Sequence, residues 1–138
     1  GELYSVINGV ASTAVARRLQ KNFRNAGLEI TIEQWSILYH LWKEDGLSQQ
    51  ELCTRTFRDK ASITRLIDNI EKLGLVERIA SKDDRRVNLV YLTDAAKPLQ
   101  EATYNLANQT MNEALQGISK EEIEIVKSVF QRVYENSK

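Results

Sequence analysis

The strongest constraint on the fold is a change of hydrophobic period at Gly74. Before this glycine, four apolar residues share one helical face at the spacing i, i+3, i+4 and i+7: Ile63, Leu66, Ile67 and Ile70. After it, residues 75–79 and 87–92 are rich in β-branched and aromatic side chains, and the charged run 81–86 separates them. This order predicts an amphipathic helix followed directly by a β-hairpin with a charged tip.

Capping signals divide the preceding residues into further helices. Thr31 as cap, with Glu33 and Gln34 in the first turn, predicts a helix over about 32–44 that ends near Gly46. Ser48 with Glu51 has the spacing of a capping box for a short helix that ends near Phe57. Asp59 is the expected cap of the next helix, which runs from Lys60 to Leu73. Two short helices joined by a tight turn form a helix-turn-helix, and the hairpin after them is then a wing.

Both ends of the chain are expected to form long amphipathic helices. One helix is predicted from Leu3 to about Ala26, a second from a Thr93-Asp94 cap to about Gln116, and a last one after a Ser119–Glu122 capping box. Their apolar stripes exceed what a small winged core covers, which favours a helical partner in a two-fold dimer. The alternative is that these helices pack only on their own domain.

Composition narrows the class of protein. With 138 residues and 42% hydrophobic content, the chain fits one domain, and no window has the roughly 18 uninterrupted apolar residues of a membrane helix. We therefore expect a cytoplasmic protein that contacts no membrane. The single Cys53 excludes an internal disulfide, and His40 without a cysteine partner matches no usual zinc spacing. Common catalytic signatures are missing, so we expect neither an enzyme nor a cofactor.

Charge is unevenly distributed along a chain whose formal net charge is zero. Residues 55–93 carry nine Lys or Arg against six Asp or Glu, while residues 27–54 are acidic. A protein that coats nucleic acid through bulk charge is disfavoured, but a specific DNA binder needs only a local cationic face. The expected fold is mainly α with a small β-hairpin: one domain over 1–138, with a winged helix-turn-helix in 28–93 and helical dimerisation segments in 1–27 and 94–138.

The sequence resembles the MarR family of bacterial transcription regulators over essentially its whole length. The segments 31–38, 47–52 and 59–67 are similar to the family's second, third and recognition helices. Asp84-Arg85-Arg86, followed by Leu92-Thr93, matches the family pattern Asp-x-Arg-x5-Leu-Thr. The resemblance implies a homodimer that binds a palindromic double-stranded DNA operator, usually as a repressor, and that in many members releases DNA when a small ligand or an oxidant acts.

The start of the recognition helix supplies the first set of expected DNA contacts. Short polar side chains there reach base edges in the major groove, so Ser62, Thr64 and Arg65 are the candidates, with Arg65 bidentate to guanine. Lys60 is assigned to a phosphate, and Ser48 and Gln49 to the DNA backbone. The alternatives are a solvated helix face for the first three residues and simple capping for Ser48.

The charged tip of the hairpin supplies the second set. A planar guanidinium suits a narrow minor groove, and a neighbouring carboxylate holds it in position. Arg86 is assigned to the groove, Asp84 to its orientation, and Lys82 and Arg85 to phosphates. The alternative is a tip that is only solvated.

Other residues allow competing interpretations. Trp35, Tyr39 and His40 lie on the helix that, by the resemblance, borders the cleft between the DNA-binding and dimer regions, so they are effector-pocket candidates; aromatic core packing is the alternative. For Cys53 core packing is favoured over a thiol-based oxidant sensor. The main rival to DNA binding is a winged-helix module that binds protein, which the neutral net charge favours.

Overall fold

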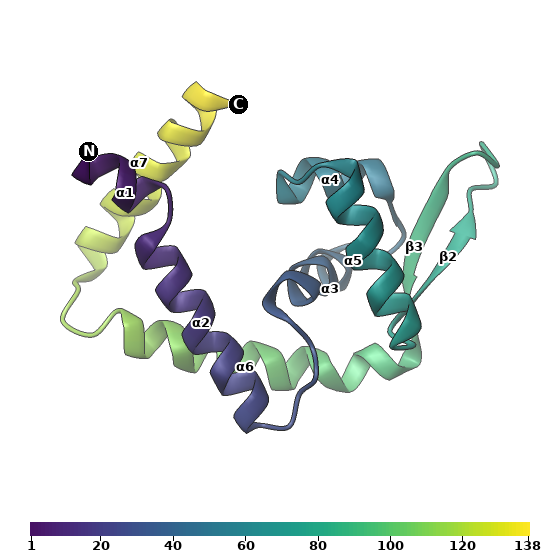
Figure 1. Cartoon of the computed structure of the whole chain (residues 1–138), viewed down its shortest axis with the longest axis horizontal. Helices are drawn as coiled ribbons and strands as arrows, with labels where there is room; N and C mark the ends of the chain where they lie inside the picture. The colour runs from purple at the N-terminus through teal and green to yellow at the C-terminus, as the bar shows by residue number, and fades with distance from the viewer.

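The computed structural model describes all 138 residues and is mainly helical, with a small antiparallel sheet. Its elements are, in chain order, α1 Glu2–Ile7, α2 Val10–Asn25, α3 Ile32–Lys43, β1 Leu47–Ser48, α4 Gln49–Thr56, α5 Lys60–Lys72, β2 Val76–Ala80, β3 Asn88–Leu92, the 3-10 turn η1 Asp94–Ala96, α6 Lys97–Ala114 and α7 Lys120–Ser137. Helices α3 to α5 and the strands gather at one end, α6 runs beneath them, and both termini lie at the other end (Figure 1). No helix has the length and apolar character needed to cross a membrane.

The core is centred where α3, α5 and the base of the sheet meet. All four residues of the predicted stripe on α5 are buried, with at most 7% of their surface exposed. They pack in one cluster with the buried face of α3 and with Val76 and Val90 of the strands, and Phe23 of α2 joins this cluster. The change of period at Gly74 therefore predicted the helix with its buried face, and the hairpin after it.

Helix starts follow the predicted caps. The side-chain oxygens of Thr31, Asp59 and Ser119 each accept the backbone N–H three residues on, and Thr31 and Ser119 form complete capping boxes. Ser48 caps α4 by accepting the N–H of Glu51 at 3.1 Å, without the reciprocal bond of a full box. These local hydrogen bonds satisfy donors that no helix can pair internally.

Two predicted boundaries are wrong. The first helix is interrupted, because Gly9 adopts a φ of 116° and starts α2 as a separate segment. Thr93 does not cap the following helix with its side chain; its hydroxyl instead donates to the carbonyl of Gly74 at 2.6 Å, and α6 begins only at Lys97 after a 3-10 turn. The apolar spacing of the first helix continues across Gly9 and gives no sign of the break, whereas Thr93 has a suitable capping side chain whose hydroxyl is bonded elsewhere.

The sheet has three strands where the sequence indicated two. β2 and β3 pair as the predicted hairpin, with Arg78 opposite Val90, and the two-residue β1 adds an edge through Leu47 opposite Val90. A carboxylate oxygen of Asp45 accepts the N–H groups of Gly46 and Leu92 at 3.0 and 2.9 Å. The turn before α4 is thereby fixed to the wing, so α4 and the hairpin share one rigid base.

Candidate nucleic-acid interface

The N-terminus of α5 is defined by Asp59. Its carboxylate accepts the backbone N–H of Ser62 at 2.7 Å, and this bond is the main reason why the pKa of Asp59 lies below its ordinary value. Lys60 is exposed at this end of the helix. A helix N-terminus with a free lysine beside it is a suitable binding place for a phosphate group.

The three residues of α5 that were predicted to contact bases differ in exposure and in hydrogen bonding. Arg65 is exposed and makes no ion pair, so its guanidinium is free to bind a ligand. Ser62 is half-buried beside the cap. The hydroxyl of Thr64 donates to the carbonyl of Lys60 at 2.8 Å and accepts from the Gln49 amide at 2.5 Å. Its only proton is therefore used within the protein.

At the wing tip, Asp84 contacts Arg86 in three ways. The carboxylate accepts the backbone N–H of Arg86 at 3.0 Å, the Nε–H at 3.1 Å and an Nη2–H at 3.3 Å. These bonds, the side-chain ones first, hold the pKa of Asp84 below its ordinary value. The Arg86 side chain remains 90% exposed. The expected pairing is thus present, and it leaves the guanidinium pointing outward from a fixed base; Lys82 and Arg85 are exposed on the same tip without ion pairs.

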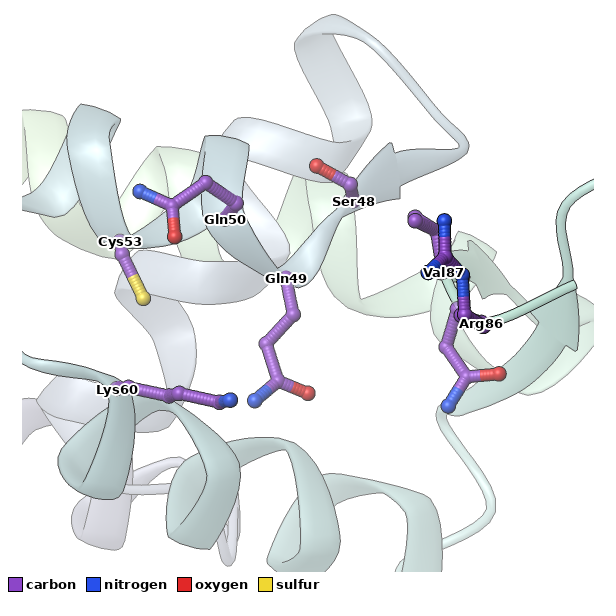
Figure 2. Close-up of a pocket in the computed structure, with 8 residues that line it drawn as sticks. Ser48, Gln49, Gln50, Cys53, Lys60, Arg86 and Val87 are labelled. Atoms are coloured by element: carbon purple, nitrogen blue, oxygen red, sulfur yellow. The ribbon is translucent and has the colours of Figure 1, made fainter. Parts of the chain in front are cut away.

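A cavity of about 340 Å³ brings both predicted regions together (Figure 2). Four of the predicted DNA contacts line it, together with Gln50, Cys53, Val87 and Asn88: Ser48, Gln49, Lys60 and Arg86. Figure 2 shows the Lys60 side chain extending toward the Gln49 amide, with Arg86 on the far side of the hollow. Residues 38 positions apart in the sequence, Ser48 and Arg86, therefore share one polar hollow between α4, α5 and the wing.

The sequence did not indicate Arg78, which joins the wing to α5. Its Nη1 donates to Glu71 at 2.9 Å and its Nη2 donates to Asp68 at 2.6 Å, with a further weak contact to the Thr64 carbonyl at 3.4 Å. The Arg78 backbone N–H also donates to Glu71 at 3.2 Å. The only available signal was a charged residue inside a β-rich run that follows two acids spaced i, i+3 on a helix.

The three effector-pocket candidates lie in a row of packed aromatic rings. Trp35 contacts Phe23 edge-on at 5.9 Å between centroids, and Tyr39 lies 5.7 Å from Trp35 and 6.0 Å from Tyr104 of α6. The polar hollow and four further cavities are lined by other residues. The pKa of His40 is lowered, first by burial and then by the nearby positive charges. The row links α3 to α6 through ring packing.

Cys53 lies between the hydrophobic core and the polar hollow. It belongs to the hydrophobic core cluster and is 9% exposed, and its side chain also lines the polar hollow. A thiol that is this well covered packs as a small apolar side chain. Oxidant sensing by Cys53, the less favoured alternative, is not tested by these contacts.

Comparison with known proteins identifies the family. Residues 27–87 match the sequence profile of the MarR family. A probable transcriptional regulator from Pseudomonas aeruginosa is 30% identical, with 88% of this chain and 92% of that chain covered at a TM-score of 0.76. A second transcriptional regulator is 28% identical over 96% of both chains, with a TM-score of 0.81. A cysteine-to-serine mutant of MarR from E. coli has the same fold, at 23% identity over 97% of this chain and 95% of that chain, with a TM-score of 0.74. Such regulators bind DNA through a winged helix-turn-helix and are not enzymes, which confirms both predictions, and the chain belongs to the MarR family of transcriptional regulators.

Proposed function

We propose that this regulator binds a palindromic DNA operator as a homodimer, acts as a repressor, and releases the operator when a small-molecule effector binds. One observation carries the DNA part of the proposal. Ser48, Gln49, Lys60 and Arg86 come from three separate segments, and they line a single polar hollow beside the N-terminus of α5. Donors that converge in this way suit the phosphates and edges of a DNA groove.

The reading geometry follows from the two exposed arginines. With α5 in the major groove, Arg65 reaches a guanine, Ser62 and Thr64 face neighbouring bases, and Lys60 binds a phosphate. The wing then extends to the flanking minor groove, where Arg86, held by Asp84, enters the region of greatest negative potential. Lys82 and Arg85 at the wing tip, together with Ser48 and Gln49 at the start of α4, bind the phosphate backbone on either side.

Helices α1 and α7 support the homodimer. Neither helix contains a buried residue. A helix as short as α1 is marginal by itself in water, and an amphipathic helix such as α7 needs a partner for its apolar face. They border a largely apolar groove of about 510 Å³ that includes Val6, Ile7, Met111 and Phe130. A second copy of the chain covers this face and supplies the second recognition helix that a palindrome requires. Residues 28–93 are then the reading part, with 1–27 and 94–138 forming the dimer part.

The aromatic row supports the effector part of the proposal. It joins α3 of the reading part to Tyr104 of α6, and the indole N–H groups of Trp35 and Trp42 are buried there without hydrogen-bond partners. A buried donor without a partner costs free energy, and a ligand with acceptor atoms recovers it. An aromatic acid that separates α3 from α6 at this row would tilt the reading part away from its operator. Trp35, Tyr39 and His40 would then contact the effector.

A gel-shift titration tests the DNA part. The probe is the promoter next to the chain's own gene, and the titration is repeated at several salt concentrations. A groove contact is worth about 1–3 kcal/mol and occurs twice in a dimer, so Arg86→Ala should nearly abolish binding. Arg24→Ala, which removes an exposed arginine from the last turn of α2, outside both predicted DNA-contact regions, serves as the matched control and should bind as the wild type does. Equal affinity of Arg86→Ala and wild type would contradict the wing assignment, and no salt-dependent binding at all would favour a protein-binding module.

A further inference from the structure

Arg78 occupies the last position of β2 that is not exposed. Of the five β2 residues, Val76 is buried and Arg78 is partly buried, with 18% of its side chain exposed, whereas Ile79 and Ala80 are exposed. Beyond this point β2 is exposed, and the hairpin continues to the tip that carries Arg86. An isolated two-stranded hairpin is marginally stable. Strand β1 and the bond from Leu92 to Asp45 hold the wing on the side of β3, and Arg78 holds it on the side of β2.

The contacts of Arg78 all go to α5. Its guanidinium binds Asp68 and Glu71, one turn apart on the helix, and its backbone N–H binds Glu71 as well. The third acceptor, the Thr64 carbonyl, belongs to a residue whose hydroxyl is held by Gln49 of α4. In Figure 1, α5 and the hairpin of β2 and β3 lie at the same end of the molecule, next to each other. The recognition helix is thus fixed to the wing on one side and to α4 on the other.

We propose that Arg78 is a positioning residue that sets the spacing between the recognition helix and the wing, so that α5 and Arg86 reach adjacent grooves of the operator together. The inference rests on the proposed DNA-binding function. Arg78 itself contacts no DNA, because its guanidinium is largely covered and its donors are directed to the two carboxylates. A planar fork with several donors is suited to this task, and a lysine ammonium is not equivalent to it.

Asp68 and Glu71 can affect operator affinity in two ways, by holding Arg78 in place or by repelling the DNA phosphates, and the two effects can be distinguished. Asp68 and Glu71 lie on the helix that faces the DNA, and their side chains are 49% and 41% exposed. If only charge mattered, neutralising them would remove repulsion from phosphates and tighten binding. If they hold Arg78, the same change releases the wing and weakens binding. The two explanations therefore predict opposite signs for the same variant.

The experiment compares Asp68→Asn/Glu71→Gln with Glu77→Gln/Asp83→Asn, a control that removes two negative charges from the wing without touching the Arg78 contacts. Operator affinity is measured by gel shift, and amide hydrogen exchange of residues 76–92 is followed without DNA. We expect the first variant to bind at least about fivefold more weakly, the lower end of the value of one specific groove contact. Its wing amides should exchange faster, while the control binds at least as tightly as wild type with unchanged exchange.

A double-mutant cycle provides the second readout. Arg86→Ala should cost less affinity in the Asp68→Asn/Glu71→Gln background than in wild type, because a released wing no longer places Arg86 in its groove. Arg78→Lys should restore only part of what Arg78→Gln loses. Equal or tighter binding of Asp68→Asn/Glu71→Gln with unchanged exchange would overturn the proposal. If wild type binds no operator, the proposed function fails, and the exchange rates alone decide whether Arg78 holds the wing.

Discussion

Replacing Gly46 with alanine should destabilise the protein through two separable effects. Gly46 has a φ of 73°, and a Cβ at this position would lie 2.7 Å from Cε1 and 2.9 Å from Cζ of Tyr91. The left-handed backbone costs about 1–2 kcal/mol for a residue with a Cβ, and forcing a methyl group into an occupied space costs about 1–3 kcal/mol more. The ring has limited freedom to move, because Tyr91 lies in β3 between Val90, which bonds to Gly46, and Leu92, which bonds to Asp45.

Gly27→Ala isolates the backbone part. Gly27 has a φ of 79°, close to that of Gly46, but a Cβ there would meet nothing within 4 Å. We expect Gly27→Ala to lower the free energy of unfolding by about 1–2 kcal/mol and Gly46→Ala to lower it by about 2–5 kcal/mol. Urea denaturation at one fixed protein concentration measures both, since dimerisation makes stability depend on concentration. Equal losses in the two variants would show that Tyr91 yields without cost and would refute the steric reasoning.

Two further predictions concern the dimer face and the wing. Phe130→Glu places a charge in the apolar groove beside α1, so size-exclusion chromatography with light scattering should show monomers. A variant that still elutes as a dimer of unchanged stability would contradict this prediction. The pKa of Asp84 should be found below 3.8 by carboxyl NMR and should rise toward it in Arg86→Ala, because the lowered value comes from bonds to Arg86. The sign follows from linkage: the pairing is fully present above pH 3.8 and is lost only as the pH falls through the lowered pKa, so Asp84 adds no pH dependence near neutrality.

Local signals account for most of what the sequence predicted correctly. The stripe on α5 and the caps at Thr31, Asp59 and Ser119 depend on residues at most a few positions apart, and such contacts are decided by backbone geometry alone. The Asp84–Arg86 pairing belongs to the same class, because its partners are two positions apart in the sequence. Each feature can be recognised from a few neighbouring residues, although the burial of the α5 stripe depends on its packing against α3 and the strands.

The features that were missed depend on distant partners or on a single backbone angle. β1 exists only because Leu47 meets Val90, which lies 43 residues later, and two residues carry no periodicity of their own. Thr93 is a residue type that often caps helices, but its hydroxyl donates to the carbonyl of Gly74 instead. Gly9 interrupts a helix whose apolar spacing continues on both sides. Arg78 meets its acids only after the chain has turned back at Gly74.

The bond between Gln49 and Thr64 has a consequence for which bases an operator can place opposite α5. The Gln49 amide uses one N–H on the Thr64 hydroxyl, so its second N–H and its oxygen stay available to the DNA backbone. The Thr64 hydroxyl donates its single proton to the carbonyl of Lys60, so it can only accept a further hydrogen bond. With α5 in the major groove as proposed, Thr64 should consequently favour a base edge that offers a donor, such as the amino group of adenine or cytosine, over an edge that offers only acceptors.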